Sequence, residues 1–402
     1  MKMLARCLVL ISLLCSVHAQ TPACNLSPGK KMDKARMLHF ETIIASGADL
    51  SAVHFQTALE FAKVGNYQDA WFDLQLALKS IPWLDPASEP EFKPLRGCPV
   101  FRELVEQMEI KYPRTAHAKI AFTVGPKDLI PEGLAADPAD GSLYLSSIYH
   151  RKIVKIAPDG SVTDFVAEGQ DGLLGVLGIK VDARDRSVWA ASERAGESAL
   201  FHFDLHGKLL GKYSPQEKGK HLFNDLAITS RGDVYVTDSE DSSVYTLRQG
   251  SDRLRRLSLG PRFYPNGIVL SPDEKILYVA HAFGIVMMDL KKSTFVPVKA
   301  GRDVSTAQID GMYFWRGHLI AVQNGFGPNR IVSLQLSDDQ RSIIAGWLLE
   351  FRSENLELPT TGAILNGKFY YIVNSQVDHE EDGKLKNEGE LRPVKIATIE
   401  LW

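Results

Sequence analysis

A pattern of polar and apolar positions repeats six times between residue 131 and the C-terminus. Each copy begins with a polar residue that is usually followed by a glycine. An apolar stretch, a turn, and a β-branched and aromatic run come next, as in PEGLAADPADGSLYLSS and PNGIVLSPDEKILYVAHA. Successive copies are 45, 47, 42, 44 and 51 residues apart when aligned on Gly133, Gly178, Asp225, Gly267, Gly311 and Gly362. A period of this length with several strands per unit is typical of a β-propeller.

The strand pattern also predicts how the ring closes. Alternation of period two begins with AKIAFTV at Ala118, and the first blade is expected to have strands over 132–137, 142–147, 152–157 and 161–166. The last copy is followed by only three strands, so AKIAFTV supplies the fourth and removes a free sheet edge. We therefore expect an all-β fold, a six-bladed β-propeller, over residues 114–402.

A helical periodicity precedes the propeller. One face carries Phe55, Ala58 and Ala62, a second carries Ala70 and Leu74, and Gly65-Asn66 separates the two helices. The segment ALEFAKVGNYQDAWFDLQLAL resembles one tetratricopeptide unit, which predicts a small N-terminal α-helical domain over 51–113 after a tail or linker at 20–50. A single unit cannot bury its own apolar face. It is expected to pack on the propeller as a stabilising cap or to recruit a protein partner.

The first residues, MKMLARCLVLISLLCSVHAQ, predict a cleavable signal peptide over 1–19, and hence a secreted or periplasmic protein. The apolar run is too short to cross a bilayer, so no membrane association is expected after cleavage. The chain has 46 Lys and Arg against 49 Asp and Glu, which argues against a nucleic-acid partner.

Two cysteines, Cys24 and Cys98, remain after removal of the signal. In an exported protein they indicate one disulfide between the tail and the helical region, and the alternative is a pair of free thiols. Neither cysteine has a histidine nearby that would complete a nucleophile pattern.

The residue before each aligned position carries the candidate chemistry. These residues are Glu132, Leu177, Asn224, Asn266, Asp310 and Thr361. If each inner strand starts at the aligned position, all six point toward the central channel, and four of them offer oxygen ligands suited to Ca²⁺ or another divalent cation. The alternative is that Asn-Gly and Asp-Gly pairs only form turns. Turns alone do not require the acid in PEG or the aligned apolar residues that follow.

These features resemble the gluconolactonase and regucalcin family, also called the senescence marker protein family, and its relatives the paraoxonases and diisopropylfluorophosphatases. The resemblance covers residues 118–402. It implies an axial Ca²⁺ held by a Glu in the first blade and by later Asn, Asn and Asp residues at strand starts. PEG, FND, PNG and IDG match these places in order, at Glu132, Asn224, Asn266 and Asp310. It also implies that Asp310 is the catalytic base or nucleophile.

The implied function is a Ca²⁺-dependent hydrolase of a lactone or related ester, acting on a small molecule. The alternative is a noncatalytic binding propeller whose helical unit recruits a partner. A strictosidine-synthase-like propeller shares the architecture but has no need for the acidic ring. The chain contains no G-x-S-x-G, H-E-x-x-H, P-loop or C-x-x-C sequence that would indicate a competing catalytic set.

Loops on the ligand face supply candidate substrate contacts. The candidates are His221, His150, Arg194, Tyr264 and His281, and the same loops contain Asn324 to Asn329. His221 either orients substrate and shuttles protons or is a solvated loop histidine. The loop from Gln376 to Arg392 is expected to be a lid or a solvated, mobile loop.

Overall fold

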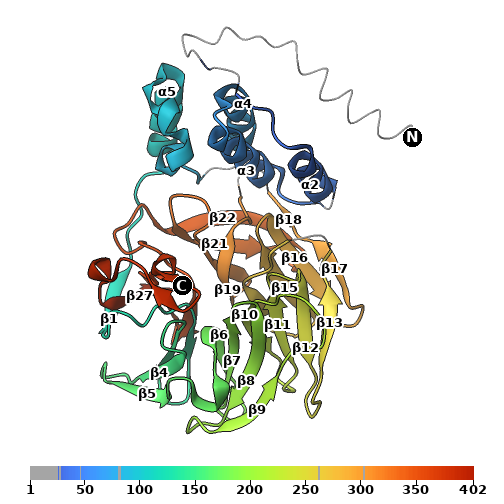
Figure 1. Cartoon of the computed structure of the whole chain (residues 1–402), viewed down its shortest axis with the longest axis vertical. Coiled ribbons are helices and arrows are strands. Elements are labelled where there is room, and N and C mark those ends of the chain that lie inside the picture. Colours follow the sequence, from blue (N-terminus) through green and yellow to red (C-terminus); the bar gives the residue numbers. More distant parts are fainter. Residues whose placement is uncertain (1–25, 27–28, 46, 80–82, 261–262, 302–303) are drawn as a thin grey trace.

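Six antiparallel sheets form the blades of a ring, which confirms the six-bladed β-propeller (Figure 1). The computed structural model describes residues 26, 29–45, 47–79, 83–260, 263–301 and 304–402.

Five of the blades follow one another along the chain, and in each the inner strand comes first. Their strands are β2 (Leu134–Ala136), β3 (Leu143–Ser147), β4 (Lys152–Ile156) and β5 (Val162–Val166); β6 (Gly175–Val181), β7 (Val188–Arg194), β8 (Glu197–Phe203) and β9 (Leu209–Tyr213); β10 (Phe223–Ile228), β11 (Val234–Asp238), β12 (Ser243–Leu247) and β13 (Leu254–Ser258); β14 (Ile268–Leu270), β15 (Ile276–His281), β16 (Gly284–Asp289) and β17 (Thr294–Pro297); and β19 (Ile309–Trp315), β20 (His318–Gln323), β21 (Arg330–Leu336) and β22 (Ser342–Phe351).

The sixth blade closes the ring as the pattern predicts. Its strands run in the order β1 (Lys119–Val124), β27 (Val394–Glu400), β24 (Lys368–Ile372) and β23 (Gly362–Leu365). The outer strand β1 therefore comes from before the first blade, with Lys119 opposite Thr398. A short strand, β18 (Lys299–Ala300), adds a parallel edge to β22 in the fifth blade.

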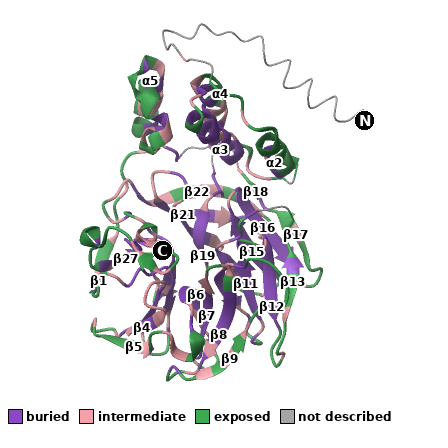
Figure 2. Ribbon diagram, viewed as in Figure 1, coloured by how far each residue is buried: buried purple, intermediate pink, exposed green. Residues whose placement is uncertain are grey.

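Each gap between neighbouring blades holds its own apolar cluster. Between the second and third blades, for example, Trp189 and Leu200 pack with Phe223 and Tyr245. Middle strands such as β3, β11 and β12 are buried along their whole length because both faces contact a neighbouring blade (Figure 2). Outer strands such as β5 are largely exposed to solvent.

The repeated glycine has a steric cause. A Cβ atom at Gly133 would lie 2.1 Å from the carbonyl oxygen of Leu177, and one at Gly267 would lie 2.1 Å from that of Asp310. These oxygens belong to the next blade around the ring. The inner strands approach so closely at this level that only glycine fits at these positions.

The helical region contains α2 (Lys34–Ala45), α3 (Leu50–Lys63), α4 (Tyr67–Leu78) and α5 (Pro99–Lys111), with 3₁₀ turns η1 (Pro86–Ser88) and η2 (Pro90–Gly97) before α5. The α3–α4 pair joined at Gly65-Asn66 is present as expected. Side chains of Asp49 and Asn66 cap the two helix starts. Cys98 is disulfide-bonded, and its partner, like the predicted partner Cys24 and the predicted signal, lies outside the described residues.

The segment expected to be a tail or linker over 20–50 contains the helix α2. This helix has no clear apolar stripe, because Met37, Leu38 and Ile44 are exposed. It is held instead by Phe40 and Ile43, which pack against Val53 of α3 and Phe283 of the fourth blade. A tertiary contact that the local sequence does not show therefore stabilises it.

The helices pack on one side of the propeller, beside β18, β21 and β22 (Figure 1). Phe55 of α3 contacts Phe326 in the loop after β20, with ring centroids 5.0 Å apart. Trp83 joins the cluster between the fourth and fifth blades. The apolar face of the helical pair is thus covered mainly by Phe92, Leu95 and Phe101 of the segment that follows it, and at one end by Ala307 and Phe326 of the propeller. Within the described residues, no helix is long and apolar enough to span a membrane.

A fully buried arginine joins the two regions. Arg330 of β21 donates through Nη1 to the carbonyls of Trp83, Phe326 and Pro328, at 3.2, 3.3 and 3.0 Å, and through Nε to Gln323. Burial lowers its pKa to about 10, and Glu89 opposes this shift. Because Trp83 lies in the segment between α4 and α5, this cation ties the helical region to the fifth blade.

Replacing Arg330 with Met is expected to lower the free energy of unfolding by about 3 kcal/mol, because it leaves buried carbonyls without a donor. Urea unfolding measures the change. The matched control is Arg341→Met, which removes an exposed 3.3 Å ion pair with Asp289 and is expected to cost under about 1 kcal/mol. Equal effects of the two substitutions would contradict the role of Arg330.

Candidate metal centre and active site

The four predicted ligand residues all lie at the starts of inner strands. Asn224 and Asp310 fall where the pairing of β10 with β11, and of β19 with β20, shifts register. Such β-bulges turn a side chain out of the normal alternation. Glu132 and Asn266 lie two residues before β2 and β14, just outside these strands. Irregular backbone at each place lets these side chains face the channel.

Each of the four residues has one buried oxygen without a hydrogen-bond partner. These atoms are Glu132 Oε2, Asn224 Oδ1, Asn266 Oδ1 and Asp310 Oδ1. The opposite atoms are engaged in two cases: Asn224 Nδ2 donates to Ser239 Oγ at 3.1 Å, and Asn324 Nδ2 donates to Asp310 Oδ2 at 2.6 Å. A buried acceptor without a donor costs about 1–3 kcal/mol. Four such oxygens, two from carboxylates and two from amides, fit a hard divalent cation.

The carboxylates influence one another, which shows that they converge. Burial raises the pKa of Glu132 well above its ordinary value, and the charges of Asp310 and Asp225 raise it further. Burial also raises the pKa of Asp310 to about 7, with the hydrogen bond from Asn324 opposing and the charge of Asp225 adding. A cation among these groups would favour their charged forms.

The two remaining places in the ring offer no free oxygen. Leu177 is apolar and buried. The Thr361 hydroxyl donates to the backbone carbonyl of Glu132 and accepts from the backbone of Leu134. Thr361 therefore joins the sixth blade to the first and positions the segment that carries Glu132.

Two neighbours were not assigned a role from the sequence. Asn324 follows β20 and fixes one oxygen of Asp310, as described above. Asp225 lies beside Asn224 with a side chain that is 2% exposed, and forms a 3.0 Å ion pair with Lys180 of β6. The sequence does distinguish Asp225, because it is the one aligned position of the six that is not glycine.

A cavity of about 240 Å³ is lined by two of the four ligand residues, Asn224 and Asn266. Its walls include Asn224, Asn266 and Asn324 on the polar side and Leu222 and Ile309 on the apolar side. Tyr264, a predicted substrate contact, stands at its edge. Tyr264 and Ser239 also line a second, outer cavity, whose far wall is formed by Asp33, Ala35, Arg36 and His39 at the start of α2. The helical region thus borders the approach to the axial residues.

The other predicted substrate contacts lie elsewhere. Arg194 and His221 line a polar pocket beside the second and third blades, and His150 lines another with Arg194. His150 Nε2 lies 3.1 Å from Asp128. His281 is buried between the fourth blade and the α2–α3 connection, and burial lowers its pKa to about 3. The structure therefore brings only Tyr264 to the axial cavity.

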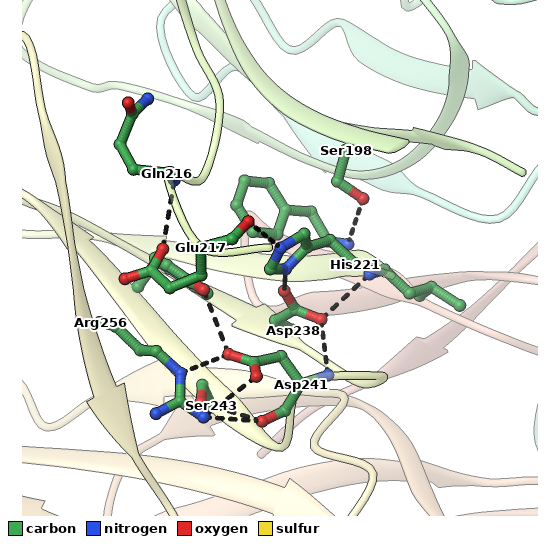
Figure 3. A network of polar contacts seen from close by, with 11 residues as sticks. Ser198, Gln216, Glu217, His221, Asp238, Asp241, Ser243 and Arg256 are labelled. Atoms are coloured by element: carbon green, nitrogen blue, oxygen red, sulfur yellow. Dashed lines mark hydrogen bonds and ion pairs between the residues drawn. The ribbon is translucent and has the colours of Figure 1, made fainter. Parts of the chain in front are cut away.

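His221 belongs to a buried polar network (Figure 3). Its Nδ1 is 2.7 Å from Asp238 and its Nε2 is 3.2 Å from the Glu217 carbonyl. Burial lowers its pKa, but these two acceptors together raise it above the ordinary value. His221, Asp238 and Asp241 can each bring a ligand atom within 4.8 Å of the others. Asp241 already binds Arg256 at 2.5 Å, so the network is saturated by its own partners.

Comparison with known sequences shows what this ring resembles. Residues 130–314 match the family described as SMP-30/Gluconolactonase/LRE-like region. The match confirms the resemblance to the gluconolactonase and regucalcin family. It contains Glu132, Asn224, Asn266 and Asp310, whereas the helices over 34–111 lie outside it.

Solved structures with a similar ring include a gluconolactonase from Xanthomonas campestris, which is 16% identical over 72% of this chain and 91% of that one, with a TM-score of 0.49. A virginiamycin B lyase from Staphylococcus aureus is also 16% identical, over 63% of this chain and 81% of that one, with a TM-score of 0.49. At these identities the similarity says nothing of the reaction. No curated protein sequence matches the chain.

The SMP-30/gluconolactonase-like ring carries a structured loop after β24. The segment 376–392, expected to be a lid or a mobile loop, contains η4 (Val377–His379), a hairpin of β25 (Glu380–Glu381) and β26 (Lys384–Leu385), and η5 (Glu388–Glu390). Gln376 anchors it by donating to the carbonyls of Lys127 and Arg392. Its hairpin lines the same polar pocket as Arg194 and His221.

Without divalent cations, the free energy of unfolding is expected to fall as the pH rises from about 4 to about 8. Asp310 keeps its proton up to about pH 7 when folded but releases it near 3.8 when unfolded, so raising the pH in this window favours the unfolded chain. The loss from Asp310 alone is at most roughly 4 kcal/mol. Urea unfolding in chelator at several pH values measures it.

The control for this pH dependence is Asp310→Asn, which cannot titrate at this position and should make the curve shallower, with the raised pKa of Glu132 leaving a smaller dependence of the same sign. Added Ca²⁺ should restore stability to the unmodified chain at the upper end of the window, by binding only the folded state. A pH dependence that is the same in both proteins would contradict the assignment to Asp310.

Proposed function

We propose that this protein is a Ca²⁺-dependent hydrolase of a lactone or related ester. The observation that carries the proposal is the set of four buried, unpartnered oxygens on Glu132, Asn224, Asn266 and Asp310. These residues would hold the cation, and their oxygen-only chemistry favours Ca²⁺ while allowing another divalent ion. When bound, such a cation polarises a carbonyl oxygen and so activates a lactone or ester toward water.

Asp310 is proposed as the catalytic carboxylate. Asn324 holds its Oδ2 at 2.6 Å, which fixes the plane of the carboxyl group and leaves Oδ1 directed away from this donor. In the reaction that free oxygen would take a proton from the attacking water or attack the carbonyl carbon itself. In the first route water adds to the carbonyl carbon, the ester C–O bond breaks, and the proton passes to the alkoxide leaving group. In the second route Oδ1 displaces the alkoxide to form an anhydride with the acyl group, and a water molecule then hydrolyses this anhydride and restores the carboxylate.

Substrate is proposed to enter between α2 and the third blade. The outer and inner cavities share Tyr264 and Ser239, so a molecule that crosses this edge arrives beside Asn224 and Asn266. The inner cavity of about 240 Å³ suits a small molecule. Leu222, Ala282 and Ile309 add apolar surface to this cavity.

We also infer that the protein is exported, to the periplasm or the exterior. The signal-like residues 1–19 support this inference, and so does the disulfide at Cys98, since disulfides persist in oxidising compartments. The competing function, a noncatalytic binding propeller, is separated from hydrolysis by the experiment below.

A panel of lactones and aryl esters is expected to be turned over, and a chelator is expected to abolish the turnover. Glu132→Gln and Asp310→Asn should reduce kcat/KM by at least about a hundredfold, since each removes a carboxylate from the site. The matched control is Asp289→Asn, on β16 away from the channel. Turnover that survives the chelator would contradict the Ca²⁺ role, and the absence of turnover with every substrate would favour a binding protein.

Narrowing the entrance should affect large substrates more than small ones. Ala35→Trp places a bulky ring in the outer cavity and is expected to lower kcat/KM severalfold for the bulkier members of the panel, while Ca²⁺ affinity measured by calorimetry stays unchanged. Met37→Trp is the control, because Met37 is exposed on α2 without lining the cavity. Equal kinetics for the two variants would place the entrance elsewhere.

A further inference from the structure

One charged pair lies beside the axial ligands without contributing an unpartnered oxygen. Asp225 occupies the place where the other five aligned positions have glycine. Its carboxylate is 2% exposed and accepts from the backbone of Leu226 at 2.8 Å and of Ile268 at 3.4 Å. The side chain is therefore fixed by the third and fourth blades.

Lys180 comes to this carboxylate from the second blade. It lies on β6, and its Nζ is 3.0 Å from Asp225 Oδ1 and 5.2 Å from the centre of the Tyr313 ring. Tyr313 belongs to β19 in the fifth blade, and its hydroxyl accepts from the backbone of Gly362 in the sixth. Because these contacts join opposite parts of the ring, the Lys180 ammonium lies in the central channel.

The charges around the axis then form a simple sum. Glu132, Asp225 and Asp310 carry three negative charges when ionised, and Lys180 carries one positive charge. The charge of Asp225 acts on both ligand carboxylates, and that of Lys180 acts on Glu132. The group as a whole therefore has a net charge of −2, equal and opposite to one divalent cation.

We propose that Lys180, by pairing with Asp225, is the counter-charge that matches the axial site to a divalent cation and keeps Asp225 from becoming a further ligand. This inference rests on the proposed function, since it concerns the same cation site. Without the ammonium, the site would have a net charge of −3, and Asp225 Oδ1 would keep only the backbone of Leu226 as a partner. The site would then bind cations more tightly and favour trivalent ones.

The experiment compares Ca²⁺ and La³⁺ affinities by calorimetry in the full-length protein. Lys180→Met is expected to bind Ca²⁺ about tenfold and La³⁺ about thirtyfold more tightly than the unmodified chain, because the interaction scales with the charge of the ion. Asp225→Asn is expected to weaken both, and the double variant should return to within about threefold of the unmodified affinities. The shift in the La³⁺ to Ca²⁺ ratio is the decisive readout, because a merely structural loss would weaken both ions without that shift.

Two controls accompany this series. Lys180→Arg keeps the charge and should behave as the unmodified chain, and Lys212→Met removes a lysine that lies 4.8 Å over the Phe201 ring on the second blade, outside the channel, and should change neither affinity. If Lys180→Met does not fold, Lys180→Gln replaces it. Unchanged or weaker Ca²⁺ binding in Lys180→Met, or unchanged binding in Asp225→Asn, would overturn the inference. Absence of cation binding in the unmodified chain would instead overturn the proposed function.

Discussion

The close approach of the inner strands around the axis is the constraint on which the rest of the structure depends. Where a Cβ atom at Gly133 or Gly267 would strike a neighbouring carbonyl, the backbone of one blade lies directly against the next. This contact sets the diameter of the channel. The ligand residues immediately precede the aligned positions, so the level at which the blades meet is also the level that carries the polar side chains.

The groups that would bind a cation at the axis lower the stability of the folded chain when no cation is present. Two buried carboxyl groups with raised pKa values, and amide oxygens without donors, destabilise the folded chain on their own. The apolar clusters between neighbouring blades outweigh this cost. Arg330 is a different case of a buried charge, because backbone carbonyls surround it and it joins two regions of the chain. The axial carboxyl groups offer free oxygens to a ligand, whereas Arg330 is bound by the protein itself through Nε and Nη1.

The sequence predicted the features that repeat. Blade number, closure by the strand from Lys119, and the shared register of Glu132, Asn224, Asn266 and Asp310 all follow from comparing copies of one pattern. The helical pair joined at Gly65-Asn66 was also predicted, from its apolar faces, but several other features without a repeat were missed. The helix α2 depends on Phe283, distant in the chain, and the burial of His281 depends on the helical region packing over it. The pairing of Lys180 with Asp225 joins two blades, and a pattern within one blade cannot show it.

The closing strand also orders events during folding. The helical region lies early in the chain, yet its apolar face packs on Phe326 and the carbonyl of Trp83 binds Arg330, which is 247 residues further on. That surface exists only once the fifth blade has formed, and the ring is complete only when β27 pairs with β1. Contacts this distant form late and slowly. The part of the protein that is synthesised early therefore reaches its final environment among the last.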